Sequence, residues 1–372
     1  MKINYDCRYY LGEKPCRYKR LCEDCPHYDP MGARILIIKL GAMGDTLRTT
    51  PLLHALAREH EKLHVTWITD PASYPLLQKN SLIDRLWLMD LEALMRLDVE
   101  HWDAAYCFDK DARAIAALVR CRADRKMGFG MNEYGTLRAV NPESDYAVRL
   151  GLDDPLKFEQ NRKTYQQITF EMAGMEFGGE RYVLEHASED VKAAEDKLES
   201  LGLVEGERLI GLNTGAGEIF ATKRWLPERW IELGRMLTDA GAGRLLLLGG
   251  PEEVQRNAFI RQDLGERVVD TGTDNPLMVF AAIVSRLDLM VSSDTLAMHL
   301  ALASGVPCVA LFGSTTPHEV EMYGLGEKVV GRADCGPCYR SQCDDMICMQ
   351  DITAGRVFEA CTRVLETAKG GR

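Results

Sequence analysis

The stretch ILIIKLGAMGDTLRTTPLL, residues 35–53, decides the fold of this chain. Its first part, ILIIKL (35–40), is a largely apolar run that predicts a buried strand, and residues 46–60 predict the helix that follows it. Glycines lie at the turn between them, together with a carboxylate, Asp45. A carboxylate at this position is either an ordinary helix cap, which the loop alone favours, or a reacting group.

The same succession of strand and helix is predicted along the rest of the chain. Apolar runs predict further strands at 64–69, 83–90, 103–109, 286–294 and 307–313, and at the starts of 209–217 and 244–250. Such strands, alternating with helical patterns, indicate parallel sheets with crossover helices. The sequence therefore predicts an α/β protein with two sheets in series, joined near 180–190, and a ligand site at the carboxyl ends of the strands, in the crevice between the sheets. The polar stretch 141–162 predicts a loop.

Composition limits the classes of protein that this chain can belong to. Its 372 residues can form two domains, and 46% hydrophobic and 27% charged residues are typical of a soluble globular protein. No apolar run is long enough to span a bilayer, and the first residues lack the apolar core of a signal peptide, so we expect a cytoplasmic protein. A net charge of −11 argues against nucleic acid as a partner.

One stretch, 110–126, is locally basic. Its charged side chains form either a solvated helix and loop or a local basic pocket; they are Lys110, Arg113, Arg120, Arg122, Arg125 and Lys126.

Twelve cysteines are many for a cytosolic chain, and eight of them form two clusters. The first cluster, Cys7, Cys16, Cys22 and Cys25, has the spacing C-x8-C-x5-C-x2-C, which favours a structural zinc or iron–sulfur site over disulfides or free thiols. The second, CGPCYRSQCDDMIC (335–348), also contains a CxxC pair, although a metal is less favoured there. The remaining four resemble single buried or half-buried thiols, at positions 107, 121, 308 and 361.

Two further loops follow predicted strands and carry groups that suit phosphate. In NTGAGEIFATKRWLPERW (213–230), a glycine-rich turn and Lys223 precede a helix, which predicts a phosphate cradle; the alternative is a plain surface loop. In SSDTLAMHLALASG (292–305), Asp294 and Thr295 lie where a strand ends and a helix begins, so the N–H groups of the first turn suit a pyrophosphate. His299 lies on the same helical face as Thr295, or is a core histidine. Neither GxxxxGK[ST] nor GxGxxG occurs, which weakens ATPase and dinucleotide-binding interpretations.

These stretches together resemble glycosyltransferase family 9, the ADP-heptose:lipopolysaccharide heptosyltransferases. The resemblance covers residues 34–355 and rests on ILIIKLGAMGDTLRTTPLL, GLNTGAG…KRWLPERWIEL, LLLLGGPEE, VSSDTLAMHLALASGVPCVALFGSTTP and CGPCYRSQC…CMQDI. It implies a GT-B fold, in which two Rossmann-like domains with parallel sheets face each other across a cleft. It also implies an inverting mechanism without a catalytic metal.

The resemblance assigns roles to individual positions. Asp45 matches the general base, and Lys223 matches the lysine that contacts the donor phosphates. The loop with Asp294, Thr295 and His299 matches the segment that holds the diphosphate and sugar, and Glu253, or its neighbour Glu252, should hold the donor ribose. The full expected donor site is Thr214, Gly215, Lys223, Glu253, Asp294, Thr295, Leu296 and His299, and the expected acceptor site is Gly44, Lys110 and Arg113. Leu296 stands where many members carry glycine.

The resemblance also predicts the organisation and the partners. We expect a cysteine-rich extension (1–30), an acceptor domain (31–185), a donor domain (186–350) and a C-terminal helix (351–372). The expected reaction moves a heptose, or a similar sugar, from a nucleotide-diphosphate donor such as ADP-heptose to an anionic, lipid-linked glycan such as the lipopolysaccharide core. Such an acceptor implies peripheral contact with the inner face of the inner membrane. The alternatives are a GT-B enzyme that uses another nucleotide sugar, and a non-catalytic redox or metal protein built on the cysteine clusters.

Overall fold

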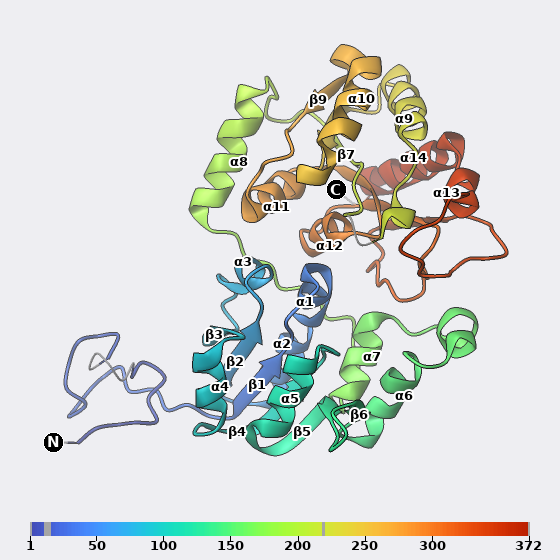
Figure 1. Ribbon diagram of the computed structural model, residues 1–372. Helices are drawn as coiled ribbons and strands as arrows, with labels where there is room; N and C mark the ends of the chain where they lie inside the picture. The colour runs from blue at the N-terminus through green and yellow to red at the C-terminus, as the bar shows by residue number, and fades with distance from the viewer. Residues whose placement is uncertain (1, 11–15, 218–219, 371–372) are drawn as a thin grey trace. The chain divides into compact units, whose positions relative to one another are not determined.

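The structure is a computed structural model that describes residues 2–10, 16–217 and 220–370 (Figure 1). Residues 11–15 of the expected cysteine-rich extension and the last two residues of the expected terminal helix lie outside this description. The chain divides into two compact units. The N-terminal unit comprises Met1–Asp154 and Gln166–Glu185, and the C-terminal unit comprises Pro155–Tyr165 and His186–Arg372.

The N-terminal unit contains a six-stranded sheet with the order β3-β2-β1-β4-β5-β6. Strands β1 to β5 are parallel, and β6 is antiparallel to β5. Its elements are β1 (Arg34–Ile38), α1 (Met43–Thr49), α2 (Leu52–Glu59), β2 (His64–Thr69), α3 (Tyr74–Leu77), β3 (Arg85–Leu88), α4 (Leu91–Leu97), β4 (His101–Cys107), α5 (Ala112–Arg120), β5 (Arg122–Met131), β6 (Leu137–Ala139), a 3-10 helix (Pro142–Ser144), α6 (Asp145–Arg149) and α7 (Tyr165–Met172).

Strand β1 is the centre of this sheet and of its core. Residues 35–38 are fully buried, as a strand covered on both faces requires. The strand pairs with β2 on one side and with β4 on the other, so the order of the strands reverses there. In open parallel sheets the ligand site lies outside the carboxyl ends of the strands at this reversal. The fold thus places the loop after β1 at the expected position for a site.

The predicted helix 46–60 is in fact two helices, α1 and α2, separated at Pro51. Proline has no N–H group, so Pro51 cannot donate the hydrogen bond that would continue the helix to the carbonyl of Leu47. The hydroxyl of Thr50 donates to that carbonyl instead, at 2.7 Å. The break ends the helix that carries Asp45 and starts α2 at Leu52.

The C-terminal unit repeats the plan, with the sheet order β12-β11-β10-β7-β8-β9 and parallel pairing throughout. Its elements are a π-helix (Leu156–Gln160), α8 (Ser188–Ser200), β7 (Leu209–Asn213), a 3-10 helix (Ala221–Lys223), α9 (Pro227–Asp239), β8 (Arg244–Leu248), a 3-10 helix (Pro251–Glu253), α10 (Val254–Leu264), a 3-10 helix (Gly265–Arg267), β9 (Val268–Asp270), α11 (Leu277–Ser285), β10 (Leu289–Ser293), α12 (Leu296–Ala303), β11 (Cys308–Phe312), β12 (Gly326–Val330), α13 (Ile347–Asp351) and α14 (Ala354–Gly370).

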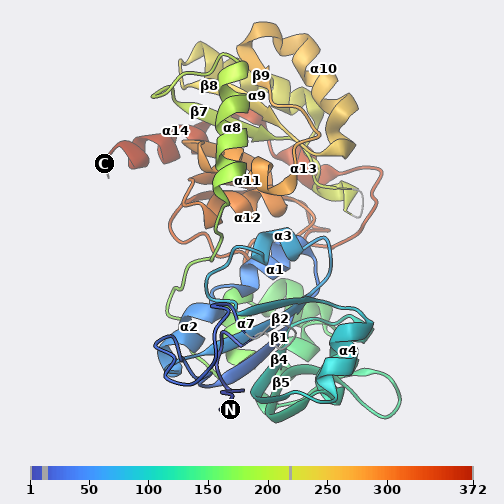
Figure 2. The ribbon, with the colours of Figure 1, turned by 90° about the vertical axis from the view of Figure 1, so that its left-hand side faces the viewer.

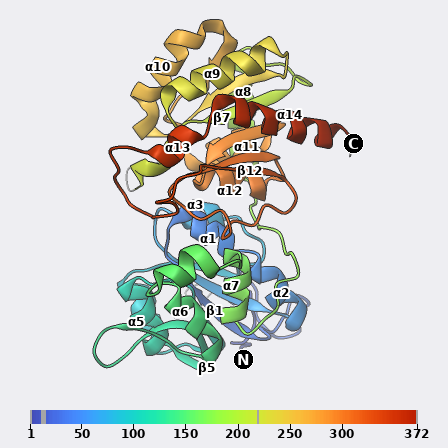
Figure 3. The ribbon, with the colours of Figure 1, turned by 90° about the vertical axis from the view of Figure 1, so that its right-hand side faces the viewer.

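Helices cover both faces of this second sheet. Helices α8, α11 and α12 form one layer, in which α11 contacts both of the others (Figure 2). Helices α9, α10 and α14 form the layer on the opposite face, in which α9 contacts both of the others (Figure 3). The strand order reverses between β7 and β10. The loops after these two strands therefore lie where a ligand site is expected in this sheet, as the loop after β1 does in the first sheet.

Several elements differ from the sequence-based expectation. The stretch 141–162, expected to be a loop, contains α6 and the π-helix. Part of the basic stretch forms β5, which is largely exposed over its first half and so lacks the apolar run that marks the other strands. Strands β9 and β12 and helix α11 were also not predicted. Over the described ranges, no helix combines the length and the apolar character needed to cross a membrane.

Candidate functional site

In the N-terminal unit, a buried ion pair fixes the start of the loop that follows β1. The Nζ atom of Lys39 lies 3.2 Å from Oδ2 of Asp109, which follows β4. The same carboxylate oxygen accepts the backbone N–H groups of Leu40, at 3.0 Å, and of Gly41, at 3.2 Å. Lys39 also donates to the carbonyl of Gly41. These bonds join the carboxyl ends of the two strands at which the strand order reverses.

The Asp109 carboxylate is held in its charged form. Burial raises the pKa of Asp109, but the Lys39 charge and the backbone hydrogen bonds from Asp111 and Gly41 lower it more, so that the net pKa lies below its usual range. The sequence analysis did not assign a role to either member of the pair. The available signals were a lysine within the apolar run 35–40 and an aspartate as the last residue of the predicted strand 103–109.

Asp45 is the third residue of α1 and does not cap it. The cap position is Ala42, and no side chain of the described residues caps this helix. The capping alternative is therefore wrong. Oδ1 of Asp45 instead accepts a hydrogen bond from Nη1 of Arg48 at 3.2 Å. The Arg48 side chain is 9% exposed and that of Asp45 is 39% exposed, so the carboxylate reaches solvent while a buried cation orients it.

The acceptor residues expected in this unit lie on different elements. Gly44 precedes Asp45 in α1. The Nζ atom of Lys110 lies 3.5 Å from the carbonyl of Ala147 and 5.2 Å from the centroid of the Phe129 ring. Arg113 donates to both oxygens of Asp70, at 3.1 and 2.8 Å, and also bonds Asp111. Hydrogen bonds to these two carboxylates, Asp111 foremost, raise the pKa of the Arg113 guanidinium.

The rest of the basic stretch is similarly dispersed. Arg120 pairs with Asp98, and Lys126 donates to the carbonyl of Val119 at 2.7 Å. Arg113, Arg120 and Lys126 thus each bond a different segment of the chain.

In the C-terminal unit, Asn213 joins the ends of β7 and β10. Its Nδ2 group lies 3.1 Å from Oγ of Ser292 and 3.4 Å from Oγ1 of Thr295. Thr295 occupies the cap position of α12, but its hydroxyl bonds Ser292, at 3.0 Å, rather than the backbone of the helix. In the part of the chain that is described, no side chain caps α12. The first turn, which begins with Leu296, therefore offers N–H groups to an anion.

Lys223 brings a positive charge to the same place. Its Nζ atom donates to Oδ2 of Asp294 at 2.9 Å and to the carbonyl oxygen of Asp294 at 3.1 Å. Both side chains are mostly buried, with 18% and 15% exposed. The structure thus brings together Lys223, Asp294 and Thr295, which the sequence had placed in two separate loops. His299 is buried inside the unit, as a core histidine would be.

The carboxylate of Glu253 faces the glycine-rich loop after β7. A Cβ atom built on Gly215 would overlap this carboxylate, so only glycine fits there without a shift. Glu253 is buried, whereas Glu252 is exposed, and Oε2 of Glu253 accepts the N–H group of Gly250 at 2.9 Å. The other oxygen, Oε1, is buried without a hydrogen-bond partner among the residues that the structure describes. A buried acceptor of this kind suits a ligand hydroxyl.

An open cavity of about 450 Å³ lies beside α10 and the end of β9. Its walls include Asn257 and Arg261, one helical turn apart on α10, with Asp270 at the end of β9 and Thr273 in the segment that follows. Asn257 links the cavity to the glycine-rich loop, because the hydroxyl of Thr214 donates to its Oδ1 at 2.5 Å. The sequence analysis missed this cavity, although the i, i+4 spacing of the two polar residues on α10 was visible.

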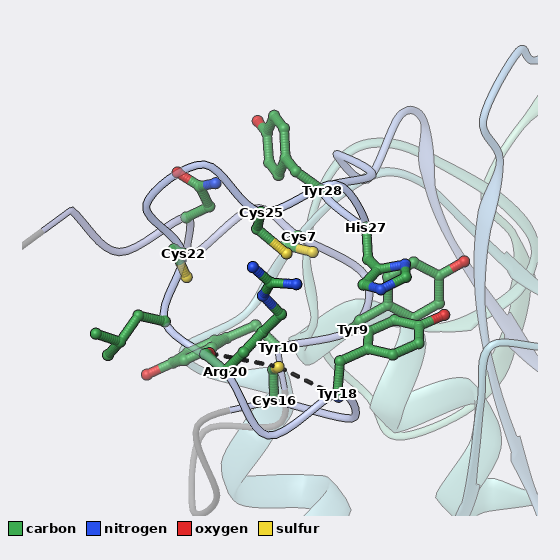
Figure 4. Close-up of a pocket in the computed structure, with 12 residues that line it drawn as sticks. Cys7, Tyr9, Tyr10, Cys16, Tyr18, Arg20, Cys22, Cys25, His27 and Tyr28 are labelled. Carbon is green, nitrogen blue, oxygen red and sulfur yellow. Dashed lines mark hydrogen bonds between the residues drawn. The ribbon is translucent and has the colours of Figure 1, made fainter.

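The cysteines are all free in the structure. Cys7, Cys16, Cys22 and Cys25 line one pocket (Figure 4), but no group of three or more metal-binding side chains among the described residues lies close enough to hold a metal ion. The metal site that the spacing predicts is therefore not formed in this arrangement. Burial raises the pKa of Cys107 to about 12 and of Cys121 to about 11, as expected for unreactive core thiols.

Comparison with known proteins finds a matching family, related sequences and similar folds. Residues 111–346 match the family described as glycosyltransferase family 9 (heptosyltransferase). The chain is 23% identical over 307 residues to lipopolysaccharide heptosyltransferase 1 of Escherichia coli O18:K1:H7, covering 80% of this chain and 90% of the relative.

Two solved structures show the likeness of the fold. A glycosyl transferase family 9 protein from Veillonella parvula matches with a TM-score of 0.71 at 18% identity, covering 90% of this chain and 97% of that one. The E. coli ADP-heptose lps heptosyltransferase II matches with a TM-score of 0.65 at 17% identity, covering 90% and 99%. The predicted α/β fold class, with two Rossmann-like parallel sheets of the GT-B type, is confirmed.

Proposed function

The chain belongs to glycosyltransferase family 9 and is a heptosyltransferase-like glycosyltransferase, and from this premise we propose that it transfers a heptose from ADP-heptose to a lipopolysaccharide core or related glycan. The donor and acceptor follow the names of the relatives, a lipopolysaccharide heptosyltransferase and an ADP-heptose enzyme. The observation that carries the proposal is the arrangement at the carboxyl ends of β7 and β10, where Lys223 lies beside the uncapped start of α12.

The groups at this edge match the parts of a nucleoside diphosphate. The diphosphate is placed against Lys223 and the N–H groups of the first turn of α12, because a cation and a helix start both favour negative charge. In this proposal a ribose hydroxyl donates to Oε1 of Glu253, which is buried without a partner among the described residues. The cavity beside Asn257 provides the space for the base. In this proposal Thr214, which bonds Asn257, and Gly215, which faces Glu253, lie beneath the nucleoside.

The proposed chemistry is a direct displacement at the anomeric carbon of the donor. Asp45 takes the proton of an acceptor hydroxyl as that oxygen forms the new glycosidic bond. The bond from the anomeric carbon to the diphosphate breaks, and the negative charge that develops on the departing nucleoside diphosphate is stabilised by Lys223 and the α12 terminus. Attack from the side opposite the leaving group inverts the configuration. No catalytic metal takes part in this scheme.

The acceptor is proposed to lie along the N-terminal unit near Asp45 and Gly44, with Lys110 and Arg113 facing its anionic groups. Arg113 already bonds Asp70, so an anionic acceptor would share this guanidinium with a resident carboxylate. A lipid-linked acceptor requires the enzyme to work at a membrane surface, which we propose to be the inner face of the inner membrane.

Transfer assays on the purified full chain test the proposal. Lipid-core acceptors are incubated with ADP-heptose, UDP-sugars or GDP-sugars, and the product is identified by mass spectrometry and its anomeric configuration by NMR. Asp45→Asn should lower kcat by about 10²–10⁴-fold, the usual contribution of a general base. Asp190→Asn, which changes another first-turn acid, on α8, should retain wild-type turnover. Transfer from a UDP- or GDP-sugar alone would reject the donor, and near-normal turnover by Asp45→Asn would reject the base.

A further inference from the structure

A buried hydroxyl group lies directly before the lysine of the proposed donor site. Thr222 is the second residue of the 3-10 helix Ala221–Lys223 and is 2% exposed. The next residue, Lys223, reaches Asp294 through a long and flexible side chain. The position of the Lys223 ammonium group therefore depends on where this short helix is held.

The Thr222 hydroxyl bonds two further segments of the C-terminal unit. It donates to the carbonyl of Arg340 at 2.6 Å, and its oxygen lies 3.0 Å from Oγ of Ser314, in the loop after β11. Ser314 is buried as well. A hydroxyl carries one proton and its oxygen also accepts, so both contacts are made at once when the Ser314 hydroxyl is the second donor. These two bonds hold the short helix that ends in Lys223.

Arg340 lies within the second cysteine cluster, residues 335–348, which the proposed sugar transfer does not use. The backbone of this cluster is bonded to the same serine. The N–H groups of Cys338 and Tyr339 both donate to the carbonyl of Ser314, at 3.0 and 2.9 Å. Hydrogen bonds thus join the loop after β11, the cysteine cluster and the short helix, and on the side of the cluster they use backbone groups.

The side chain of Tyr339 anchors the cysteine cluster independently of Thr222. Its ring stacks on that of Phe158, in the π-helix, at 5.5 Å between centroids, and the Nζ atom of Lys157 lies 4.0 Å from its centroid. Its hydroxyl donates to Oε2 of Glu319 at 3.3 Å. Because none of these contacts involves the short helix, the cluster is a fixed support to which Thr222 is bonded.

We propose that Thr222 is a positioning residue of the donor site, which sets the place of Lys223 by bonding its helix to Ser314 and to the second cysteine cluster. This inference rests on the proposed function, since it takes Lys223 as the cation that binds the donor diphosphate.

Lys223 is then held from both ends, by Asp294 at its ammonium group and through Thr222 at its backbone. A group that binds a charged ligand acts at full strength only when its supporting residues fix it in place. Without the Thr222 hydroxyl the short helix loses its bonds to both neighbouring segments, and Lys223 binds a diphosphate less tightly.

The experiment measures ADP binding to the full chain by calorimetric titration. In Thr222→Val, which removes the hydroxyl and keeps a similar shape, we expect the affinity to fall about fivefold, the usual effect of losing one hydrogen bond. Thr222→Ser keeps the hydroxyl and should bind within about twofold of the wild type. Thr238→Val is the control, because it removes a hydroxyl that bonds only α9 and Arg267. Wild-type affinity in Thr222→Val, or an equal loss in Thr222→Ser, would overturn the proposal.

A double variant separates positioning from a general loss of stability. If Thr222 acts through Lys223, then Thr222→Val should weaken ADP binding no further in a protein that already carries Lys223→Ala. A second fivefold loss in that background would mean that Thr222 affects the site by another route, and would contradict the proposal.

A third measurement needs no nucleotide, so it distinguishes failure of this inference from failure of the proposed function. The Lys223 side chain is 18% exposed and should react slowly with an amine-acetylating reagent. In Thr222→Val, but not in Thr222→Ser, acetylation of Lys223 should be at least several-fold faster relative to that of Lys192, which is 76% exposed. Unchanged acetylation in Thr222→Val would reject the positioning role even in an active transferase. Faster acetylation in a protein that binds no ADP would support that role and reject the proposed donor.

Discussion

Lys223 Nζ lies 2.9 Å from the carboxylate and 3.1 Å from the carbonyl oxygen of Asp294, so a single ammonium group joins the loops after β7 and β10. The two residues are 71 positions apart in the chain. The pair has two consequences. It holds the start of α12 in place, and it keeps a cation at an edge where the N–H groups of that helix favour an anion.

Removing this cation should weaken donor binding and slow the reaction together. In Lys223→Ala we expect affinity for ADP and kcat each to fall about 10- to 100-fold, since a hydrogen bond to a charged group contributes about 1.5–3 kcal/mol. Calorimetric titration with ADP and steady-state kinetics measure the two effects. Arg235→Ala, which removes an exposed ion pair with Asp263 on α9 and α10, should change neither. Unaltered ADP affinity in Lys223→Ala would remove this residue from the donor site.

A methyl group at Gly215 should disturb the donor site without unfolding the protein. Because a Cβ atom there would overlap the Glu253 carboxylate, Gly215→Ala forces that side chain to move. We expect ADP to bind at least tenfold more weakly while the melting temperature changes little. Gly355→Ala is the matched control: nothing lies within 4 Å of its Cβ position in α14, and the change should stabilise the helix by about 0.5–1 kcal/mol. Normal ADP affinity in Gly215→Ala would show that Glu253 does not contact the nucleotide.

Breaking the buried pair of Lys39 and Asp109, at the start of the loop between β1 and α1, should lower the stability of the protein. The side chains of Lys39 and Asp109 are 5% and 12% exposed, so Lys39→Met leaves a buried carboxylate without its cation. We expect the free energy of unfolding to fall by about 3–5 kcal/mol, measured by denaturant titration. Lys192→Met breaks an exposed pair with Asp196 on α8 and should cost no more than about 0.5 kcal/mol. Equal losses in the two variants would mean that the buried pair is not a structural element.

Much of the fold could be predicted from the sequence because its central strands are fully buried. The segments around β1, β7 and β10 are apolar runs that end in glycine or polar residues, and the structure places strands there. Strand β5 could not be found in this way, since its first half is largely exposed and carries charged residues. Its place in the sheet follows from pairing with β4, a contact that local patterns do not encode.

The site could be predicted only in part, for a similar reason. Motif residues such as Lys223 and Asp294 were identified one loop at a time, and the structure supplies the bond between them. The pairing of Lys39 with Asp109 joins positions on two strands and becomes visible only when β1 and β4 are adjacent. Whether Asp45 caps its helix was likewise undecided by the sequence, because caps depend on backbone angles that place Ala42, not Asp45, at the cap.

A buried histidine should make the stability of the protein depend on pH. Burial lowers the pKa of His64, at the start of β2, from 6.5 to about 4; the Asp84 charge opposes this shift, and the charges of Arg85, Arg34 and Arg8 add to it. In the unfolded chain His64 therefore takes up a proton near pH 6.5, whereas in the folded chain it takes up this proton only near pH 4. As the pH falls from 6.5 to 4, the free energy of unfolding therefore decreases, and above pH 6.5 this histidine no longer changes it. The decrease is at most roughly 3 kcal/mol, since one pKa unit corresponds to about 1.4 kcal/mol.

Denaturant titrations at several pH values between 7 and 4 check this expectation through the variant His64→Gln. Because glutamine does not titrate, the decrease in unfolding free energy across this range should be smaller in the variant than in the wild type by up to the same roughly 3 kcal/mol. His101→Gln, which changes a 48% exposed histidine paired with Asp124 on β5, leaves His64 in place and should keep the steep dependence. A wild-type slope in His64→Gln would show that other groups, and not this histidine, take up the proton on unfolding.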